Sequence, residues 1–444
     1  MPVEIAKNVY VETVGDILDG GEPVTPPEIV GWLEPPRLAD KTPPVPQPGI
    51  YFDMPEDVYF ALPCLSQSGI KKLAASPMLF WADSWMNPNK ARVDREHHVA
   101  GKVYHCRLLE GVSIFALRFV CELERPQGDD VKIIETKEEI EAYISQIRLP
   151  GSDVCHTPIT RVPTGETKVV KGQEVPITRA AKKEDVLKQL LEIEPEAPYW
   201  PAMVSRYQQQ HQGKQMVPAW LMNDVEIAAM MIERDPDIAP LVRGGQAEVT
   251  LIWYDELTGV PMKARVDKMK VRRMIDLKTF ANQRERMPET AIRFEISSYK
   301  YNIQPAVYFE GADAVRKIVR AQGASAVHVW GEPEADEDGI IDTDAFDAWQ
   351  QRNIECQEFA LKWASHVEPD LWTWVFQQKG PAKITRAVHF PRGGTVHMVT
   401  SDIVKAAKRK FREYSEAFGT DPWLDIAPPY DLADEDLSMS ATEF

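Results

Sequence analysis

Cysteine is scarce and irregularly spaced in this sequence. The 444 residues contain five cysteines, an odd number, and none of them forms a C-x-x-C pair. A disulfide framework, a zinc site or an iron–sulfur cluster needs cysteines at closer and more regular spacing. We therefore predict reduced thiols, in the core or at the surface.

Long apolar runs are also missing. No stretch reaches about 18 apolar residues, the length that a membrane-spanning helix needs, and the first ten residues lack the basic-then-apolar layout of a signal peptide. We expect a cytoplasmic protein with no membrane partner. The 44% of hydrophobic residues is ample for a packed core, and the length allows about three domains or one elaborated α/β domain.

Basic residues are fewer than acidic ones, which gives the chain a net charge of −17. This balance argues against a protein that coats DNA non-specifically, because binding to the phosphate backbone depends on Lys and Arg. It does not exclude a nuclease, since such an enzyme can keep a local basic groove and its metal site itself adds carboxylates. Charge alone favours a protein that does not bind nucleic acid, so the motifs must decide.

Composition divides the chain into three parts. Residues 1–48 are rich in proline and carry little apolar periodicity, which is typical of a flexible arm. Residues 49–430 form the expected globular domain, with insertions near 150–182 and 331–366. The acidic segment 431–444 is expected to be a disordered tail.

Helical periodicity and capping signals recur on both sides of a central strand region. Ser66 to Gly69 opens one helix, and Thr136 with Glu139 forms a capping box that opens another through residue 147. Further helices are expected at 97–109, 184–194, 200–211, 220–234 and 295–318. Residues 150–182 are expected to be a loop or hairpin.

The central region alternates with a period of two, which predicts strands. Residues 246–254 and 261–269 should pair antiparallel around a turn at 255–259. A short link leads to a third strand at 272–279. The strands and helices together predict an α/β fold with a mixed sheet flanked by helices.

Two carboxylates and a lysine fall on neighbouring strands of this region. The period of two places Met274, Asp276 and Lys278 on one face, and Asp267 ends the preceding strand within cross-strand reach. Two acids this close repel each other unless a cation or a proton lies between them. This pattern suits a Mg²⁺ site for phosphodiester hydrolysis, to which Leu277 would add its backbone carbonyl. The alternative is a solvated sheet edge with Lys278 as a salt-bridge partner.

Two further side chains are candidate metal ligands. His105 lies on the apolar face of its predicted helix, where it could complete a metal shell or orient a metal-bound water, although such a histidine is more often a core residue. Glu248 is expected on the strand face opposite Val249 and Leu251. An exposed strand carboxylate without a ligand role is an equally good reading of Glu248.

Gln304 and Tyr308 are spaced i, i+4 on the predicted helix at 295–318. They could hydrogen-bond DNA phosphates or the catalytic lysine without adding charge. From the spacing alone, an aromatic core stripe is the favoured explanation. Pro305 should kink this helix or mark its first turn.

A basic helix start offers a candidate DNA site. Ser66 and Ser68 precede Lys71 in the first turn, and hydroxyls at a helix start beside cations can hold a terminal phosphate. An ordinary N-cap is the simpler explanation. Several cations could supply the local basic groove that the net charge lacks: Lys71, Lys72, Arg265, Lys268, Lys270, Arg272 and Arg273.

Taken together, these segments resemble the RecE-type exonucleases, the family of the exonuclease VIII C-terminal domain, within the PD-(D/E)XK nuclease superfamily. The resemblance covers most of the chain, from about residue 49 to about 429. It rests on ordered motifs: GIY at 49–51, LSQSGI at 65–70, SPMLF at 76–80, GxxxHxxLLE at 101–110, TG at 258–259, KARVD at 263–267, IDLKT at 275–279 and YxxQxxxY at 301–308. The chain departs from the family where Pro305 follows Gln304 and at the 331–366 insertion.

The resemblance implies a PD-(D/E)XK core that digests duplex DNA 5′→3′ and leaves 3′ single strands for an annealing protein in recombination. It also implies Mg²⁺, with Mn²⁺ as a substitute, a ring-like homo-oligomer, and a bacterial or phage-infected cell. The implied roles are metal binding by His105, Asp267, Asp276 and the Leu277 carbonyl, catalysis by Lys278 with Asp267, Asp276, Gln304 and Tyr308, and 5′-phosphate binding by Ser66 or Ser68. Glu248 as a further metal ligand and Lys71 and Arg265 as DNA contacts are expected from the residue patterns alone. There are two alternatives. One is a member of the superfamily that acts on single strands or endonucleolytically, and the other is an inactive scaffold that binds DNA ends.

Overall fold

The computed structural model describes residues 44–90, 96–126, 133–171, 173–282, 284–336 and 340–425. They form two compact units, one from residues 112–223 and a larger one from the rest of the chain. The predicted arm at 1–48, except for its last five residues, and the predicted tail at 431–444 lie outside the described residues.

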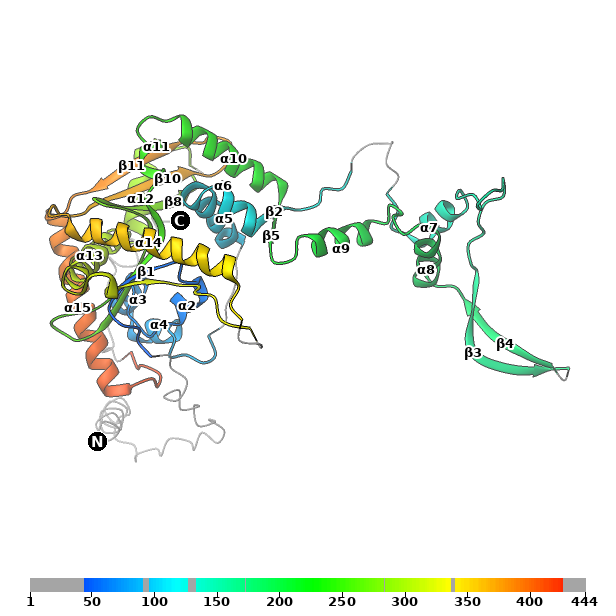
Figure 1. The fold of residues 1–444 in the computed structure, drawn as a ribbon, viewed down its shortest axis with the longest axis horizontal. Coiled ribbons are helices and arrows are strands. Elements are labelled where there is room, and N and C mark those ends of the chain that lie inside the picture. The colour runs from blue at the N-terminus through cyan, green and yellow to red at the C-terminus, as the bar shows by residue number, and fades with distance from the viewer. Residues whose placement is uncertain are drawn as a thin grey trace, which may run out of the picture. The chain divides into compact units, whose positions relative to one another are not determined.

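A seven-stranded mixed sheet forms the centre of the larger unit (Figure 1). Its strand order is β11-β10-β8-β7-β6-β1-β9. The β10–β8 and β1–β9 pairs are parallel, and the other neighbours are antiparallel. The bounds are β1 (Gly49–Phe52), β6 (Gln246–Tyr254), β7 (Pro261–Lys270), β8 (Arg273–Phe280), β9 (Val327–Val329), β10 (Leu371–Gln378) and β11 (Thr385–Phe390). The predicted mixed α/β fold and the three central strands are confirmed.

Helices flank this sheet. Those of the larger unit are α2 (Glu56–Ala61), α3 (Gln67–Ala75), α4 (Pro77–Ala82), α5 (Glu96–His105), the π-helical turn η2 (Cys106–Glu110), most of α10 (Ala219–Arg234), α11 (Ala239–Val242), α12 (Pro288–Ser298), α13 (Ile303–Gln322), the 3₁₀ turn η3 (Gly323–Ala326), α14 (Thr343–Ser365) and α15 (Thr395–Phe418). Within the described part of the chain, none of the helices is long and apolar enough to span a membrane.

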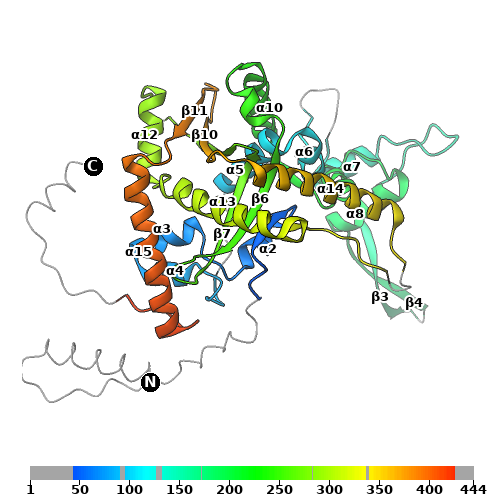
Figure 2. The same ribbon diagram turned by 60° about the vertical axis from the view of Figure 1, so that its left-hand side comes forward.

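The helix α13 packs directly on the sheet, where it covers β1, β6 and β7 (Figure 2). The alternation of β6 explains this contact, because Val249, Leu251 and Trp253 are all buried in the main core. Gly311 lets the helix approach closely, since a Cβ at that position would lie 2.6 Å from the Trp253 ring. α13 is therefore fixed over the strands that carry the candidate site.

The smaller unit has its own core. It contains α6 (Val112–Arg118), β2 (Phe119–Cys121), α7 (Lys137–Ile144), β3 (Arg161–Val170), β4 (Gln173–Ala180), α8 (Lys183–Ile193), α9 (Trp200–Gln210) and β5 (Gln215–Val217). The capping box predicted at Thr136 is present. Residues 150–182 contain the antiparallel β3–β4 hairpin, which confirms one of the two predicted possibilities.

One predicted helix is wrong. Residues 295–318 do not form a single helix, because α12 ends at Ser298 and α13 begins at Ile303. Lys300 adopts a positive φ of 50° between them, a conformation that cannot continue a right-handed helix. Pro305 then falls in the first turn of α13, where a missing N–H costs no helical bond.

Candidate active site

The strands β7 and β8 separate beside the candidate residues. They pair only at their turn, and Lys268 opposite Ile275 is the last pair. Beyond it β7 continues alongside β6, whereas β8 continues alongside β10. The next residues outward are Asp267 and Asp276, so both carboxylates stand where the sheet forks. In place of a ladder bond, the Leu277 amide donates to Asp267 Oδ2 at 3.0 Å.

Asp276 is buried at this fork with two polar partners. Lys278 Nζ lies 2.5 Å from Asp276 Oδ2, which agrees with the predicted shared face. On the other oxygen, the Gln304 amide donates to Asp276 Oδ1. Gln304 belongs to the first turn of α13, so the helix break at 299–302 determines where this amide lies.

Burial and a neighbouring carboxylate disfavour the charged form of Asp276. Burial and the Asp267 carboxylate raise the pKa of Asp276 to about 6, although Lys278 and Gln304 lower it. Burial lowers the pKa of Lys278, but Asp276 and Asp267 outweigh this effect and raise it above the usual value. The pair of carboxylates therefore favours additional positive charge in the fork.

His105 joins the fork to Glu248. Its Nε2 lies 2.9 Å from Asp267 Oδ2 and its Nδ1 lies 3.1 Å from Glu248 Oε1. Burial lowers the pKa of His105, but the Asp267 and Glu248 carboxylates raise it to about 10. Burial raises the pKa of Glu248 to about 7 despite His105, while His105 overcomes burial and lowers the pKa of Asp267. Carboxylates beside both ring nitrogens favour the protonated form of His105.

Glu110 is a functional candidate that the sequence analysis did not select. Ligand atoms of His105, Glu110 and Glu248 lie within 4.8 Å of one another. An α-helix would turn a residue at i+5 about 140° away from His105. The π-helical turn avoids this, because Gly111 N donates to Cys106 O at 3.1 Å in an i→i+5 bond. In the sequence, Glu110 stood out only as the last residue of the GxxxHxxLLE motif, five residues after the histidine.

Polar contacts hold the His105 segment in place. Lys268 Nζ is buried and donates to Leu109 O at 2.7 Å, which ties the π-turn to β7. Arg107 donates to both carboxylate oxygens of Glu226 on α10, at 2.8 and 2.9 Å. The histidine is thus positioned by a strand and a second helix.

The donor set of the fork fits a hard divalent cation. It contains carboxylates, one imidazole and no thiolate, the combination that suits Mg²⁺ or Mn²⁺. The N–H and C=O of a strand residue point to the same edge, so the Leu277 carbonyl faces Asp267 as its amide does. Metal binding by His105 would require the neutral ring and would compete with its ion pairs.

Among the predicted DNA-binding residues, Lys71 lies near the fork, whereas Ser66 and Ser68 lie at the start of α3. Lys71 Nζ lies 5.1 Å from the centroid of the Tyr301 ring, and Lys278 Nζ lies 5.0 Å from it. Burial and Lys278 lower the pKa of Lys71 to about 8. Lys71 therefore belongs to the fork. Ser66 acts as the N-cap of α3, accepting from Gly69 N at 3.3 Å, and its Oγ also contacts Ser68 Oγ at 2.9 Å.

Arg265 serves the fold in this structure. Its guanidinium donates to Met54 O at 2.7 Å and to Thr250 Oγ1 at 3.1 Å, and its side chain is 11% exposed. The Arg265 carbonyl accepts the Tyr308 hydroxyl at 2.7 Å. Tyr308 thus secures α13 against β7, and neither side chain is brought to the surface for a phosphate.

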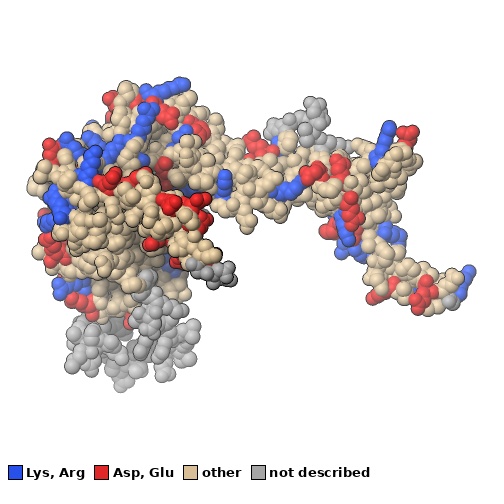
Figure 3. Space-filling view, viewed as in Figure 1, with Lys and Arg blue, Asp and Glu red and all other residues tan. Residues whose placement is uncertain are grey.

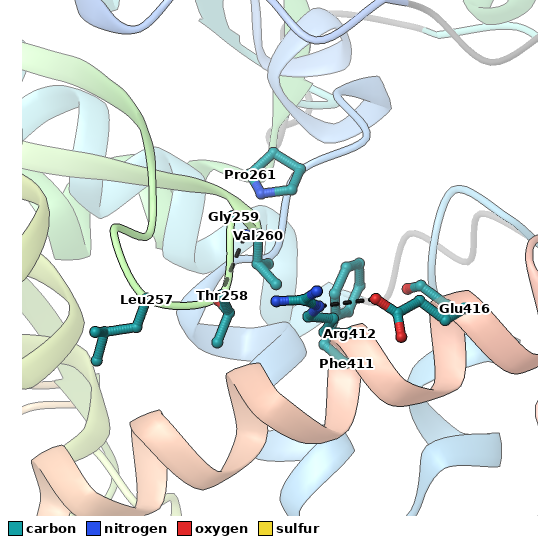
Figure 4. A pocket seen from close by; sticks show the side chains of 9 residues that line it. Leu257, Thr258, Gly259, Val260, Pro261, Phe411, Arg412 and Glu416 are labelled. Carbon is teal, nitrogen blue, oxygen red and sulfur yellow. Dashed lines mark hydrogen bonds and ion pairs between the residues drawn. The ribbon is translucent and has the colours of Figure 1, made fainter.

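Neither surface charge nor a surface cavity identifies the fork of β7 and β8 as the functional site. On the face drawn in Figure 3, basic and acidic side chains are interspersed, without one large basic surface. A cleft of about 520 Å³ lies between the β6–β7 turn and α15 (Figure 4). Arg412 and Glu416, which form an ion pair, are among the residues that line it. None of the fork residues lines this cleft.

Comparison with known proteins points to the same region of the chain. Residues 199–333 match a family model described as a PDDEXK-like domain of unknown function (DUF3799). The matched range contains Glu248, Asp267, Asp276, Lys278 and Gln304. No curated protein matches the chain. The match supports the PD-(D/E)XK nuclease superfamily, and the mixed sheet flanked by helices fits such a domain.

Proposed function

We propose that this protein is a Mg²⁺-dependent exonuclease that digests duplex DNA from its ends. The observation that carries the proposal is the meeting of Asp267, Asp276 and Lys278 at the fork of β7 and β8. Carboxylates that can hold a hard cation beside a lysine form a site suited to phosphodiester hydrolysis. A scaffold that only binds DNA ends has no need for all three.

Each side chain of the fork has its own role in the proposed hydrolysis. Asp267, Asp276, His105 and the Leu277 carbonyl would hold Mg²⁺, which supplies an activated water and neutralises charge on the phosphate. Lys278 positions the attacking water or stabilises the charge that develops on the phosphate oxygens. Gln304 orients Asp276 through its amide, so that one carboxylate oxygen keeps a fixed direction.

The finer assignment rests on the resemblance to RecE-type exonucleases. On that basis the enzyme degrades one strand 5′→3′ and leaves 3′ single strands for an annealing protein, acts as a ring-like oligomer and works in the cytoplasm. A ring that encloses its substrate would explain how a chain with a net charge of −17 stays on DNA. Lys71 is the contact we propose for phosphate, since it shares the Tyr301 ring with Lys278.

End-labelled DNA tests the proposal. Linear duplex carrying a label at either the 5′ or the 3′ end is digested with Mg²⁺ by the wild type and by Asp276→Asn, which removes charge and keeps the shape. We expect early loss of the 5′ label with the wild type and none with the variant. Circular dichroism of both proteins verifies that the fold is unchanged.

Other outcomes would select other functions. Release from single strands or cleavage of closed circles, without release from duplex ends, would keep the nuclease and overturn the exonuclease assignment. Binding of duplex ends without cleavage of any substrate would identify an inactive end-binding scaffold. Equal digestion by the wild type and Asp276→Asn would show that the fork is not the active site.

A further inference from the structure

We propose that the exposed ring of Tyr299 is a stacking platform for a nucleobase of the bound DNA, one aromatic ring away from the catalytic lysine. This inference rests on the proposed function and adds a base-binding subsite to it. The ligand class is an unpaired or terminal base of a DNA strand, recognised through its π-face.

Two tyrosines lead outward from the fork to the surface. Tyr301 is partly buried, with Lys71 and Lys278 at its ring. The Tyr299 ring stacks on Tyr301 with a centroid distance of 5.5 Å and an interplanar angle of 20°. Because the planes are nearly parallel, a base laid on Tyr299 would extend the same stack.

The outer ring is unusually accessible for a side chain that already stacks. Tyr299 is 58% exposed, so Tyr301 shields only part of it. Its backbone closes α12 as the C-cap, with the amide bonded to Glu295 O, a role that any residue could fill. More than half of the surface of Tyr299 thus stays accessible to a ligand, and an exposed aromatic face is the feature on which single-stranded nucleic acids stack.

Two cations near the stack suit the phosphates on either side of such a base, and the Glu295 carboxylate also lies near Tyr301. Lys300 follows Tyr299, is exposed, and lies close enough for its charge to act on Lys71. Its φ of 50° marks the turn between α12 and α13. A strand whose phosphate reaches Lys278 would thus pass cations and an aromatic face in succession, the combination found in grooves that bind single strands.

The test uses DNA held uncut by Ca²⁺ in place of Mg²⁺. A blunt duplex with a 5′-phosphate carries 2-aminopurine in turn at each of the first three positions of either strand. Fluorescence reports stacking and titration gives Kd. A matching duplex has an abasic site at the responding position. The variants are Tyr299→Ala, Tyr299→Phe and Tyr299→Trp, and the control is Tyr254→Ala, a 45% exposed tyrosine at the end of β6.

With the wild type we expect quenching of 2-aminopurine at one position. Tyr299→Ala should abolish the quenching and raise Kd about 5- to 150-fold, the range of one lost base stack, whereas Phe and Trp should keep both. Removal of the base should weaken binding to the wild type and leave binding to Tyr299→Ala unchanged. Tyr254→Ala should behave as the wild type.

Two failures can be told apart. If the wild type cleaves DNA and Tyr299→Ala matches Tyr254→Ala on both the intact and the abasic duplex, the platform is overturned and the nuclease stands. If the wild type neither binds nor cleaves DNA with any divalent metal, the proposed function and the platform are both overturned. Loss of quenching in Tyr299→Phe as well would also contradict stacking, since Phe keeps the ring.

Discussion

Replacement of Lys408 by methionine should destabilise the larger unit. Lys408 lies on α15 with a side chain that is 4% exposed, and its Nζ is 2.8 Å from both carboxylate oxygens of Glu310 on α13. It also bonds Asp255 in the β6–β7 turn. One ammonium thus joins two helices and the turn, and methionine would fill the space while leaving two acids without their cation.

The burial of Lys408 and its acidic partners determines how much unfolding free energy is lost. Removal of one partner from a buried ion pair costs about 3–5 kcal/mol, because the remaining charge is left without compensation. Asp255 is 8% exposed, but Glu310 is 32% exposed and water can screen it in part. We therefore expect a loss near the lower end, about 3 kcal/mol of unfolding free energy at neutral pH.

The loss of stability in Lys408→Met should become smaller as the pH falls. Burial raises the pKa of Asp255, but the bonds from Lys408 and Thr258 lower it below its usual value. A lowered pKa stabilises the fold above about pH 4 and loses that stabilisation as the pH falls through the folded value. The difference between wild type and Lys408→Met should therefore shrink below about pH 4 as Asp255 becomes protonated.

Urea unfolding followed by tryptophan fluorescence measures this change, since Trp253, Trp363 and Trp372 are buried in the larger unit. Lys405→Met is the matched control on the same helix, because Lys405 and its partner Asp402 are 53% and 75% exposed. The control should change stability by less than about 0.5 kcal/mol. Equal stability of the two variants at pH 7, or a difference that grows on acidification, would refute the reasoning.

Three further variants probe the fork and its support. Gly311→Ala should cost about 1–3 kcal/mol, because its Cβ would overlap the buried Trp253 ring and a packed core resists insertion; unchanged urea unfolding would contradict the close approach. Glu110→Gln should raise the Mg²⁺ concentration for half-maximal activity several-fold, and an unchanged titration would remove Glu110 from the site. Lys278→Met should lower kcat at least 100-fold with little change in DNA affinity, whereas weakened binding at normal kcat would make Lys278 a binding residue.

Local patterns were sufficient to predict the parts of the site that lie on consecutive strands. The period of two placed Asp276 and Lys278 on one face, and they do lie in contact. Asp267 was expected within cross-strand reach, and it stands opposite Asp276 beyond the last ladder pair. The catalytic roles of these residues stay predictions, since the geometry supports them without testing activity.

Features that depend on the distant chain or on unusual backbone were not predictable. The fork exists because β8 pairs with β10, about 100 residues later in the sequence, and no local pattern indicates that partner. The approach of Lys71 to Lys278 likewise needs α3 to pack beside α13. Glu110 was missed because an α-helix was assumed where a π-turn forms. The break at Lys300 was missed because a lysine gives no signal for positive φ.

The most direct test of the central claim is the release of acid-soluble nucleotides from uniformly labelled linear duplex DNA, with Mg²⁺ or with EDTA, by the wild type and by Lys278→Met. A covalently closed circle of the same sequence serves as the substrate without ends. We predict release from the linear duplex by the wild type with Mg²⁺ alone, and almost none from the circle or by the variant. Release in EDTA, or equal release by Lys278→Met, would contradict a metal-dependent nuclease at the fork of β7 and β8.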